Sequence, residues 1–310
     1  MRFVMEHQPP IVEAEFLDSE GRRQTFVDKV AIFTSDWPDA DSHYPQFGVI
    51  RCNVLERCPS PDDRVRIKTE VESTDGCDEF VVLAGQFCPP LSPLKTVAEN
   101  PGCDGCPMQL MFSHNHFVPP QEPNPGHDLM RLVIAEAPGE NEARVGLPLV
   151  GDAGKFFDGL LVDAGVPRDG LTITNCLSCH PPHNIFPTAW EAWSPKSKRR
   201  YISKEDGVKA VQHCKEKHVD PLLQSRKWNR VDLVGGQALQ IVAQKKGITK
   251  WKGRPLILPS GHKAIAILHP SHLKKPYLME RESRRKETVD HLKKGPSRPI
   301  LRSLSFALRA

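Results

Sequence analysis

Five of the nine cysteines stand at spacings that suit metal ligation. They form two Cys-x-x-Cys pairs and one single residue: Cys103 and Cys106, Cys176 and Cys179, and Cys214. Two tight pairs could supply four thiolates to zinc or to an iron–sulfur cluster. The gap of about 70 residues between the pairs is longer than zinc ribbons use. Free buried thiols are the alternative without such chemistry.

A second group of candidates lies in the stretch Leu132–Gly154. An apolar run ends at Glu136, Ala137-Pro138-Gly139 follows, and Asp152-Ala-Gly154 then opens a helical pattern. This pattern indicates a buried strand that ends in a polar loop before a helix. Ligands of open α/β sheets bind just beyond such strand ends. An ordinary strand–loop–helix connection would produce the same letters.

The elements that would position these residues alternate between strands and helices from Leu129 on. Four strands are predicted, at Leu132–Glu136, Leu171–Asn175, Arg230–Val234 and Ala264–Leu268. Four helices are predicted, at Lys155–Ala164, Lys204–Gln224, Gln237–Lys245 and Glu280–Lys294. Such alternation implies right-handed crossovers and a mainly parallel four-stranded sheet, which is an α/β fold.

Residues 1–97 have a different pattern, which predicts a β-rich accessory domain. Five short strands are predicted, at Ile11–Leu17, Gln24–Phe33, Val49–Leu55, Val65–Val71 and Glu79–Leu83. The first two flank a Ser-Glu-Gly turn, which is a hairpin signal. The strands would form a small antiparallel sheet or barrel. An oligonucleotide-binding barrel is disfavoured, because this part of the chain is acidic.

Composition fits a soluble globular chain of one large or two ordinary domains. The 310 residues carry a net charge of +4, but residues 1–100 hold 10 Lys+Arg against 18 Asp+Glu, so the remainder is basic enough to attract a polyanion. There is no apolar run long enough to span a bilayer and no apolar signal core. We therefore expect an intracellular, cytoplasmic protein whose cysteines are thiols or metal ligands.

Four motifs in order closely resemble the family 4 uracil-DNA glycosylases, over about residues 100–295. They are Glu136-Ala-Pro-Gly-Glu-Asn-Glu, Gly146-Leu-Pro-Leu-Val-Gly-Asp-Ala-Gly154, Ile173-Thr-Asn-Cys-Leu-Ser-Cys-His-Pro-Pro182 and His269-Pro-Ser-His-Leu. The resemblance implies a three-layer sandwich of the uracil-DNA glycosylase type. It also implies a [4Fe–4S] cluster on Cys103, Cys106, Cys179 and Cys214, with Cys176 left over. Zinc on Cys103, Cys106, Cys176 and Cys179 is the competing assignment.

The resemblance further assigns roles around a flipped uracil. Glu136 would hold the uracil edge or position water, Asn175 would read the Watson–Crick edge, and His269 would donate to a uracil oxygen as charge develops. The remaining pocket and phosphate contacts would come from Ala137, Pro138, Gly139, Leu149, Ala153, Gly154 and Ser271.

Three departures from the family pattern stand out. Leu149 occupies the position where the family usually has a Phe that stacks on uracil, and such stacking is worth roughly 1–3 kcal/mol. Ala135 stands where the family usually has Gly. The loop Pro181–Ser203 is unusually long, and its basic run Lys198-Arg-Arg-Tyr-Ile202 is expected to contact phosphates rather than to capture uracil covalently.

These features together predict a monofunctional DNA-repair hydrolase that excises uracil from DNA and leaves an abasic site. The alternatives are a catalytically weak DNA- or protein-binding relative, or a glycosylase for another modified base. We expect a monomer with three parts, namely an accessory domain at 1–97, a glycosylase-like domain at 98–295 and a basic tail at 296–310.

Overall fold

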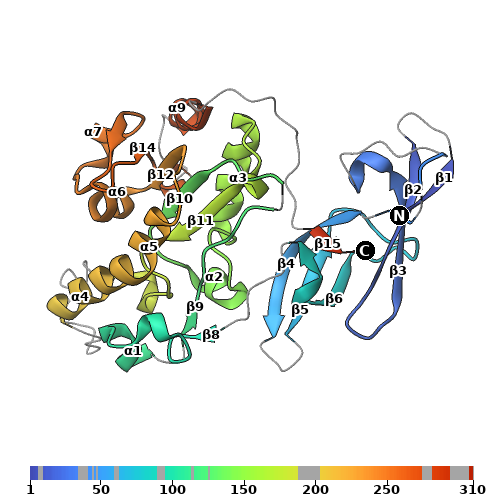
Figure 1. The fold of residues 1–310 in the computed structure, drawn as a ribbon, viewed down its shortest axis with the longest axis horizontal. Coiled ribbons are helices and arrows are strands. Elements are labelled where there is room, and N and C mark those ends of the chain that lie inside the picture. Colours follow the sequence, from blue (N-terminus) through green and yellow to red (C-terminus); the bar gives the residue numbers. More distant parts are fainter. Residues whose placement is uncertain are drawn as a thin grey trace. The chain divides into compact units, whose positions relative to one another are not determined.

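The computed structural model describes the chain except residues 6–9, 34–40, 44, 47, 59–62, 89–94, 113–114, 125, 188–202, 274–280, 294–306 and 310. It divides into two compact units (Figure 1). Unit 1 consists of Met1–Pro93, Asn124–Gly126 and Leu301–Ala310. Unit 2 consists of Leu94–Pro123 and His127–Ile300. Among the described residues, no helix is long and apolar enough to cross a membrane.

Unit 2 contains a five-stranded sheet in the order β11-β10-β12-β14-β13. In chain order its strands are β10 (Arg131–Ala135), β11 (Leu171–Asn175), β12 (Arg230–Val234), β13 (Pro255–Ile257) and β14 (Lys263–Ile267). The four predicted strands are confirmed to within one residue, and they are parallel. The fifth strand, β13, pairs antiparallel with β14 and was not predicted. Its three residues are too few to show a periodic pattern.

Both faces of the four parallel strands are buried, which explains why these strands are rich in apolar and β-branched residues. Leu132 and Ile134 of β10 join a core cluster with α6 (Gly236–Ala243), whereas Val133 and Ala135 join another with α3 (Asp152–Ala164). Successive side chains of a strand point to opposite faces, so the two clusters lie on the two sides of the sheet. The structure is therefore α/β, with helices packed against both faces.

The four predicted helices are present, with one internal change of form. Predicted helix Lys204–Gln224 consists of α4 (Lys204–Cys214), a π-helical turn at Lys215–Val219 and α5 (Asp220–Gln224). The fourth predicted helix is α9 (Arg281–Lys293). Shorter helices that were not predicted are α1 (Pro107–Phe112), α2 (Glu140–Val145), α7 (Ile248–Trp251) and α8 (Pro270–Leu273). A pair of two-residue strands, β8 (Lys95–Thr96) and β9 (His116–Phe117), completes unit 2.

A buried ionic network ties α9 to the amino ends of two strands. Arg131 and Arg230 are direct neighbours in the sheet. Asp232 lies between their guanidinium groups, at 2.5 Å from Arg131 Nε and 2.7 Å from Arg230 Nε. The two arginines also donate to the carbonyls of Leu292 and His291 near the end of α9. Asp232 is fully buried, so it compensates two buried positive charges.

Unit 1 is built from antiparallel strands. Its strands are β1 (Arg2–Met5), β2 (Ile11–Leu17), β3 (Arg23–Lys29), β4 (Val49–Cys58), β5 (Arg64–Thr69), β6 (Glu79–Leu83), β7 (Phe87–Cys88) and β15 (Ala307–Arg309). They form sheets in the orders β1-β2-β3 and β6-β5-β4-β15-β7. The predicted β2–β3 hairpin is confirmed. The predicted second strand, however, ends at Lys29 and passes into a 3₁₀ turn. Phe16, Phe26 and Phe80 pack together in its core.

Two basic segments singled out from the sequence lie mostly outside the described residues. Residues 188–202, which include the run from Lys198 to Ile202, are not described, and neither are residues 294–306. Within the predicted basic tail, residues 307–309 form β15, paired antiparallel with β4 and β7.

Candidate active site and cysteine cluster

The three predicted catalytic residues follow strands that end at the same edge of the sheet. Asn175 ends β11 and is in register with Ala135 on β10, and Glu136 comes directly after Ala135. His269 comes two residues after Ile267, the last residue of β14. Because these strands are parallel, their carboxyl ends lie together. The fold thus brings Glu136, Asn175 and His269 to one edge.

Asn175 is a buried amide without partners. Its side chain is 2% exposed, and neither its oxygen nor its nitrogen has a hydrogen-bond partner among the described residues. Leaving such a group unpaired costs about 1–3 kcal/mol. An amide that can both donate and accept is therefore held ready at the strand end for a ligand with complementary groups.

Glu136 lies beside Asn175 at the end of the neighbouring strand. Its backbone carbonyl accepts a bond of 3.2 Å from Leu177 N–H, which continues the pairing of the two strands past Asn175. Burial raises the pKa of the Glu136 carboxyl above its usual value. A carboxyl that is costly to ionise in its own surroundings gains from a ligand or water that can hydrogen bond to it.

His269 is held in one tautomer. The backbone N–H of Ser271 donates to His269 Nδ1 at 3.3 Å, and Ser271 Oγ lies 2.7 Å from the same nitrogen. Because Nδ1 accepts, the proton of the neutral ring is on Nε2. Burial, followed by the charge of His272, lowers the pKa of His269 to about 4. At neutral pH the ring is therefore an uncharged donor through Nε2.

Gly235 packs closely against the His269 side chain. It has a left-handed φ of 95°, and a Cβ there would lie 3.2 Å from the Cβ of His269. The Gly235 N–H also donates to the carbonyl of Ile267 at 2.9 Å. A side chain at this position would strain the backbone and displace the imidazole.

Glu142 joins the two ends of the loop that follows β10. Its buried carboxylate accepts from the N–H groups of Gly139 at 3.1 Å, Val150 at 3.1 Å and Gly151 at 2.8 Å. Pro138 is buried, and Ala137 packs against the cluster that contains the cysteines. Glu142 thus fixes the shape of the segment that the sequence singled out.

Leu149 is buried in the core with an unusual backbone. Its φ is 51°, in the left-handed region that leucine rarely adopts. Its carbonyl accepts from Arg168 Nη1 at 3.0 Å, and a Cβ on Gly154 would meet that carbonyl oxygen at 1.9 Å. Gly154 is therefore required by this close approach.

The predicted phosphate contacts differ in accessibility. Gly154 is buried, whereas Ala153 is partly exposed and Ser271 is exposed. The N–H of Gly139 already donates to Glu142, and Ser271 already binds His269. Their contacts with phosphate stay predictions.

The four cysteines that the resemblance selects lie in one buried cluster. Cys103 ends a 3₁₀ turn, Cys106 precedes α1, Cys179 follows β11 and Cys214 ends α4. All four are buried together with Val97, Met108 and Leu177. Cys176 instead lies in the core cluster beneath α6. The grouping thus contains the set with Cys214 rather than the set with Cys176.

The thiols of this cluster influence one another's pKa values, and Cys176 is also coupled to Cys214. Burial raises the pKa values of Cys103 and Cys214 to about 12. The pKa of the Cys179 thiol is also raised, first by burial and then by the charges of Cys214, Cys106 and Cys103. Without a cation these groups stay protonated, whereas a bound metal would favour the thiolates.

Two histidines of the helix that carries Cys214 enclose the loop of the first pair. His213 Nε2 lies 3.0 Å from the carbonyl of Gly102, and His218 Nε2 lies 4.0 Å from Cys103 Sγ. The His218 ring also packs on Phe117, with 4.9 Å between the ring centres. These contacts connect the loop of Cys103 to the helix of Cys214.

The four buried thiols of the cluster suit a metal group by their chemistry. Within the part of the chain that the structure describes, no three His, Cys, Asp or Glu side chains are arranged to hold a single ion as they stand. Four buried thiols without disulfides are nevertheless the ligands that a [4Fe–4S] cluster or a Cys₄ zinc site uses. The chemistry of the residues fits such a group.

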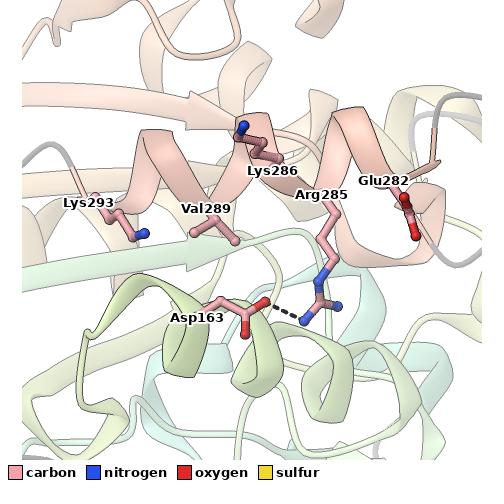
Figure 2. Close-up of a pocket in the computed structure, with 6 residues that line it drawn as sticks. All are labelled: Asp163, Glu282, Arg285, Lys286, Val289 and Lys293. Atoms are coloured by element: carbon pink, nitrogen blue, oxygen red, sulfur yellow. Dashed lines mark hydrogen bonds and ion pairs between the residues drawn. The ribbon is translucent and has the colours of Figure 1, made fainter.

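A pocket of about 420 Å³ lies between α3 and α9, and it holds none of the predicted site residues (Figure 2). It is lined by Asp163, Glu282, Arg285, Lys286, Val289 and Lys293. Arg285 pairs with Asp163 across it. The mixed charges make it an ion-paired surface groove.

Comparison with known families decides the family of the fold. Residues 123–293, more than half of the chain, match the family model described as the uracil DNA glycosylase superfamily. The chain belongs to the uracil DNA glycosylase superfamily. The matched range contains Glu136, Asn175 and His269 together with all the strands of the five-stranded sheet.

Curated members of the superfamily with similar sequences carry the name type-4 uracil-DNA glycosylase. The protein of Thermotoga maritima is 29% identical over 173 residues, which are 55% of this chain and 77% of the relative. That of Sulfurisphaera tokodaii is 26% identical over 156 residues, 45% of this chain and 62% of the relative. That of Archaeoglobus fulgidus is 41% identical over 70 residues, 22% of this chain and 35% of the relative.

Three residues that shape this glycosylase-superfamily site were missed by the sequence reasoning. They are Glu142, Arg168 and Gly235. Glu142 had a readable signal, because an acid three residues after the helix-capping Gly139 can accept from the Gly139 N–H, which is the acidic half of a capping box. Arg168 had none, since all its partners, two backbone carbonyls and the side chains of Asp158 and Gln121, lie ten or more residues away in sequence.

Proposed function

We propose that this superfamily member excises uracil from DNA by flipping the base and hydrolysing its N-glycosidic bond, leaving an abasic site. The observation that carries the proposal is the buried, unpartnered amide of Asn175 next to Glu136. The names of the curated relatives support the substrate and the reaction. DNA is accordingly the proposed partner, bound by a monomer inside the cell.

Asn175 would recognise the base. Uracil presents a carbonyl and an N–H side by side on its Watson–Crick edge, and one carboxamide can satisfy both. Burial excludes water that would compete for these bonds, so a base without this pattern would leave Asn175 unpaired. The amide therefore supports selection as well as binding.

His269 would stabilise the departing base. As the glycosidic bond breaks, negative charge accumulates on uracil, and the neutral ring donates through Nε2 to an oxygen. Ser271 and Gly235 hold this ring in place. Glu136 would hold the uracil edge or position the attacking water, and its place at the end of the neighbouring strand puts it beside Asn175.

Cys103, Cys106, Cys179 and Cys214 are the proposed ligands of a [4Fe–4S] cluster, with zinc as the alternative metal. When bound, the cluster would link three segments of the chain that are separated in sequence. Their common burial and the separation of Cys176 from them support this assignment.

We also propose the finer architecture. The core clusters on both faces of the sheet support a three-layer glycosylase domain at residues 98–295. The antiparallel sheets of unit 1 support a β-rich accessory domain at 1–97. Residues 296–310 are proposed as a basic tail.

A glycosylase for another modified base is the second candidate. It is favoured by Leu149, because a leucine lacks the aromatic face on which a flat base would stack. A catalytically weak relative that only binds DNA is motivated by the same residue.

The test uses matched oligonucleotides that contain uracil, thymine or another modified base at one position, in duplex and single-stranded form. Heating in alkali after incubation should cleave the uracil strand alone, and Asn175→Ala and His269→Ala should each abolish the cleavage. Tight binding of the uracil duplex without any cleavage would overturn the proposal in favour of the binding protein. Cleavage only at another base would overturn the substrate assignment.

A further inference from the structure

Arg168 is a buried arginine that the proposed chemistry does not use. It precedes β11 in a 3₁₀ turn and is 5% exposed. Its guanidinium donates to Pro148 O at 2.7 Å and to Leu149 O at 3.0 Å. A planar, rigid fork of donors suits two neighbouring carbonyls, and lysine cannot reproduce this geometry.

The same guanidinium is held from two other sides. Nη1 donates to Asp158 Oδ1 at 2.6 Å, and Nη2 and Nε reach Gln121 Oε1 at 2.9 and 3.3 Å. Asp158 belongs to α3. Asp158 and Gln121 therefore hold the guanidinium in place independently of its contacts with the loop.

The loop that it contacts depends on this support. Leu149 has a left-handed backbone, which is unfavourable for a residue other than glycine. Its carbonyl points between Arg168 and Gly154. Without the guanidinium, the two buried carbonyls would lose these hydrogen bonds. The strained left-handed backbone of Leu149 would then be less strongly stabilised.

Gln121 connects Arg168 to the strand of Asn175. Gln121 and Ile173 exchange two backbone hydrogen bonds, of 2.8 and 3.0 Å, and Ile173 lies two residues before Asn175. A continuous path of hydrogen bonds thus runs from β11 through Gln121 and Arg168 to the loop of Leu149.

We propose that Arg168 is a positioning residue that sets the placement of the Leu149 loop relative to Asn175, and so the affinity of the site for the flipped base. It acts through the loop and does not contact the base. The inference rests on the proposed uracil excision.

The test is Arg168→Lys in the full-length protein, with Arg285→Lys as the matched control. Arg285 makes an ion pair with Asp163 at the other pocket (Figure 2). The measurements are KM and kcat on uracil-containing DNA, the inhibition constant of free uracil, and the melting temperature. Arg168→Lys should raise the inhibition constant of uracil about tenfold and raise KM. The expected factor corresponds to the loss of roughly one hydrogen bond that positions the loop. Arg285→Lys should change neither constant.

A merely structural arginine would give a different result. It would lower the melting temperature and the active fraction, while KM and the uracil inhibition constant stayed within about twofold; that result overturns the inference. Failure of the unchanged protein to release uracil would instead overturn the proposed function itself.

A second variant serves if Arg168→Lys does not fold. Gln121→Asn keeps the backbone pairing with Ile173 and shortens the side chain that holds the guanidinium. A rise of about threefold in the uracil inhibition constant is expected. A folded Gln121→Asn variant with unchanged constants would refute the proposed path.

Discussion

Replacement of Glu142 by glutamine tests whether one carboxylate holds together the loop between β10 and α3 that carries Leu149. Glu142 is 7% exposed and accepts three backbone N–H groups, from Gly139, Val150 and Gly151. Glutamine has nearly the same shape but only one accepting oxygen. If that oxygen keeps Val150 and Gly151, the new NH₂ group faces the Gly139 N–H, donor against donor.

The magnitude follows from these three bonds. Two of them lose the charge on the acceptor, and hydrogen bonds to charged groups are about twice as strong as neutral ones. The third donor, the Gly139 N–H, is left unpaired and partly buried, at a cost of about 1–3 kcal/mol. The expected loss in the free energy of unfolding is therefore about 2–4 kcal/mol, against about 0.5 kcal/mol for an ordinary surface change.

The assay is urea denaturation followed by tryptophan fluorescence, with Glu140→Gln as the control. Glu140 is exposed in the same helix turn, and its loss removes only a favourable charge near the helix start, worth about 0.3–1 kcal/mol. Equal unfolding free energies for the two variants would refute the role of Glu142. The Glu142 variant should also show a raised KM for uracil-containing DNA, because the loop carries Leu149.

Three further predictions concern the histidine, the cysteines and the ionic network. His269 should titrate by NMR with a midpoint near 4, which lies below its ordinary pKa of about 6.5. The contribution of the neutral ring to the free energy of unfolding should therefore be complete above about pH 6.5 and be lost as the pH falls towards 4. A midpoint near 6.5 would contradict the burial argument. Cys103→Ser should abolish bound iron and the broad absorbance near 400 nm, whereas Cys176→Ser should retain both; equal loss in the two variants would contradict the ligand set. Asp232→Asn should lower the free energy of unfolding by about 3–5 kcal/mol, because two buried arginines lose their counter-charge, while kcat of the folded protein stays unchanged; a loss below about 1 kcal/mol would refute the role of that network.

The parallel sheet could be predicted because its signals are local. Each of its four predicted strands is a short run, rich in apolar and β-branched residues, that is buried on both faces of the sheet, so type and boundaries follow from the letters. β13 could not be predicted, because a three-residue strand carries no period. The π-helical turn after Cys214 could not be predicted either, since such single turns are rare within helices.

The candidate site was predictable where residues act directly and hidden where they act through others. Asn175 and His269 follow strands in recognisable motifs. Arg168 supports backbone carbonyls about twenty residues away, and no spacing rule points to such a contact. The left-handed backbone of Leu149 is equally invisible in sequence, because leucine carries no preference for it.

Release of free uracil tests the central claim most directly. An excess of protein is mixed with DNA that contains one uracil, and the free base is quantified by mass spectrometry over time. The account predicts one uracil released per strand by the unchanged protein, and a rate at least about 100-fold lower for Asn175→Ala. Equal rates for the two proteins, or no uracil released by the unchanged protein, would contradict the account.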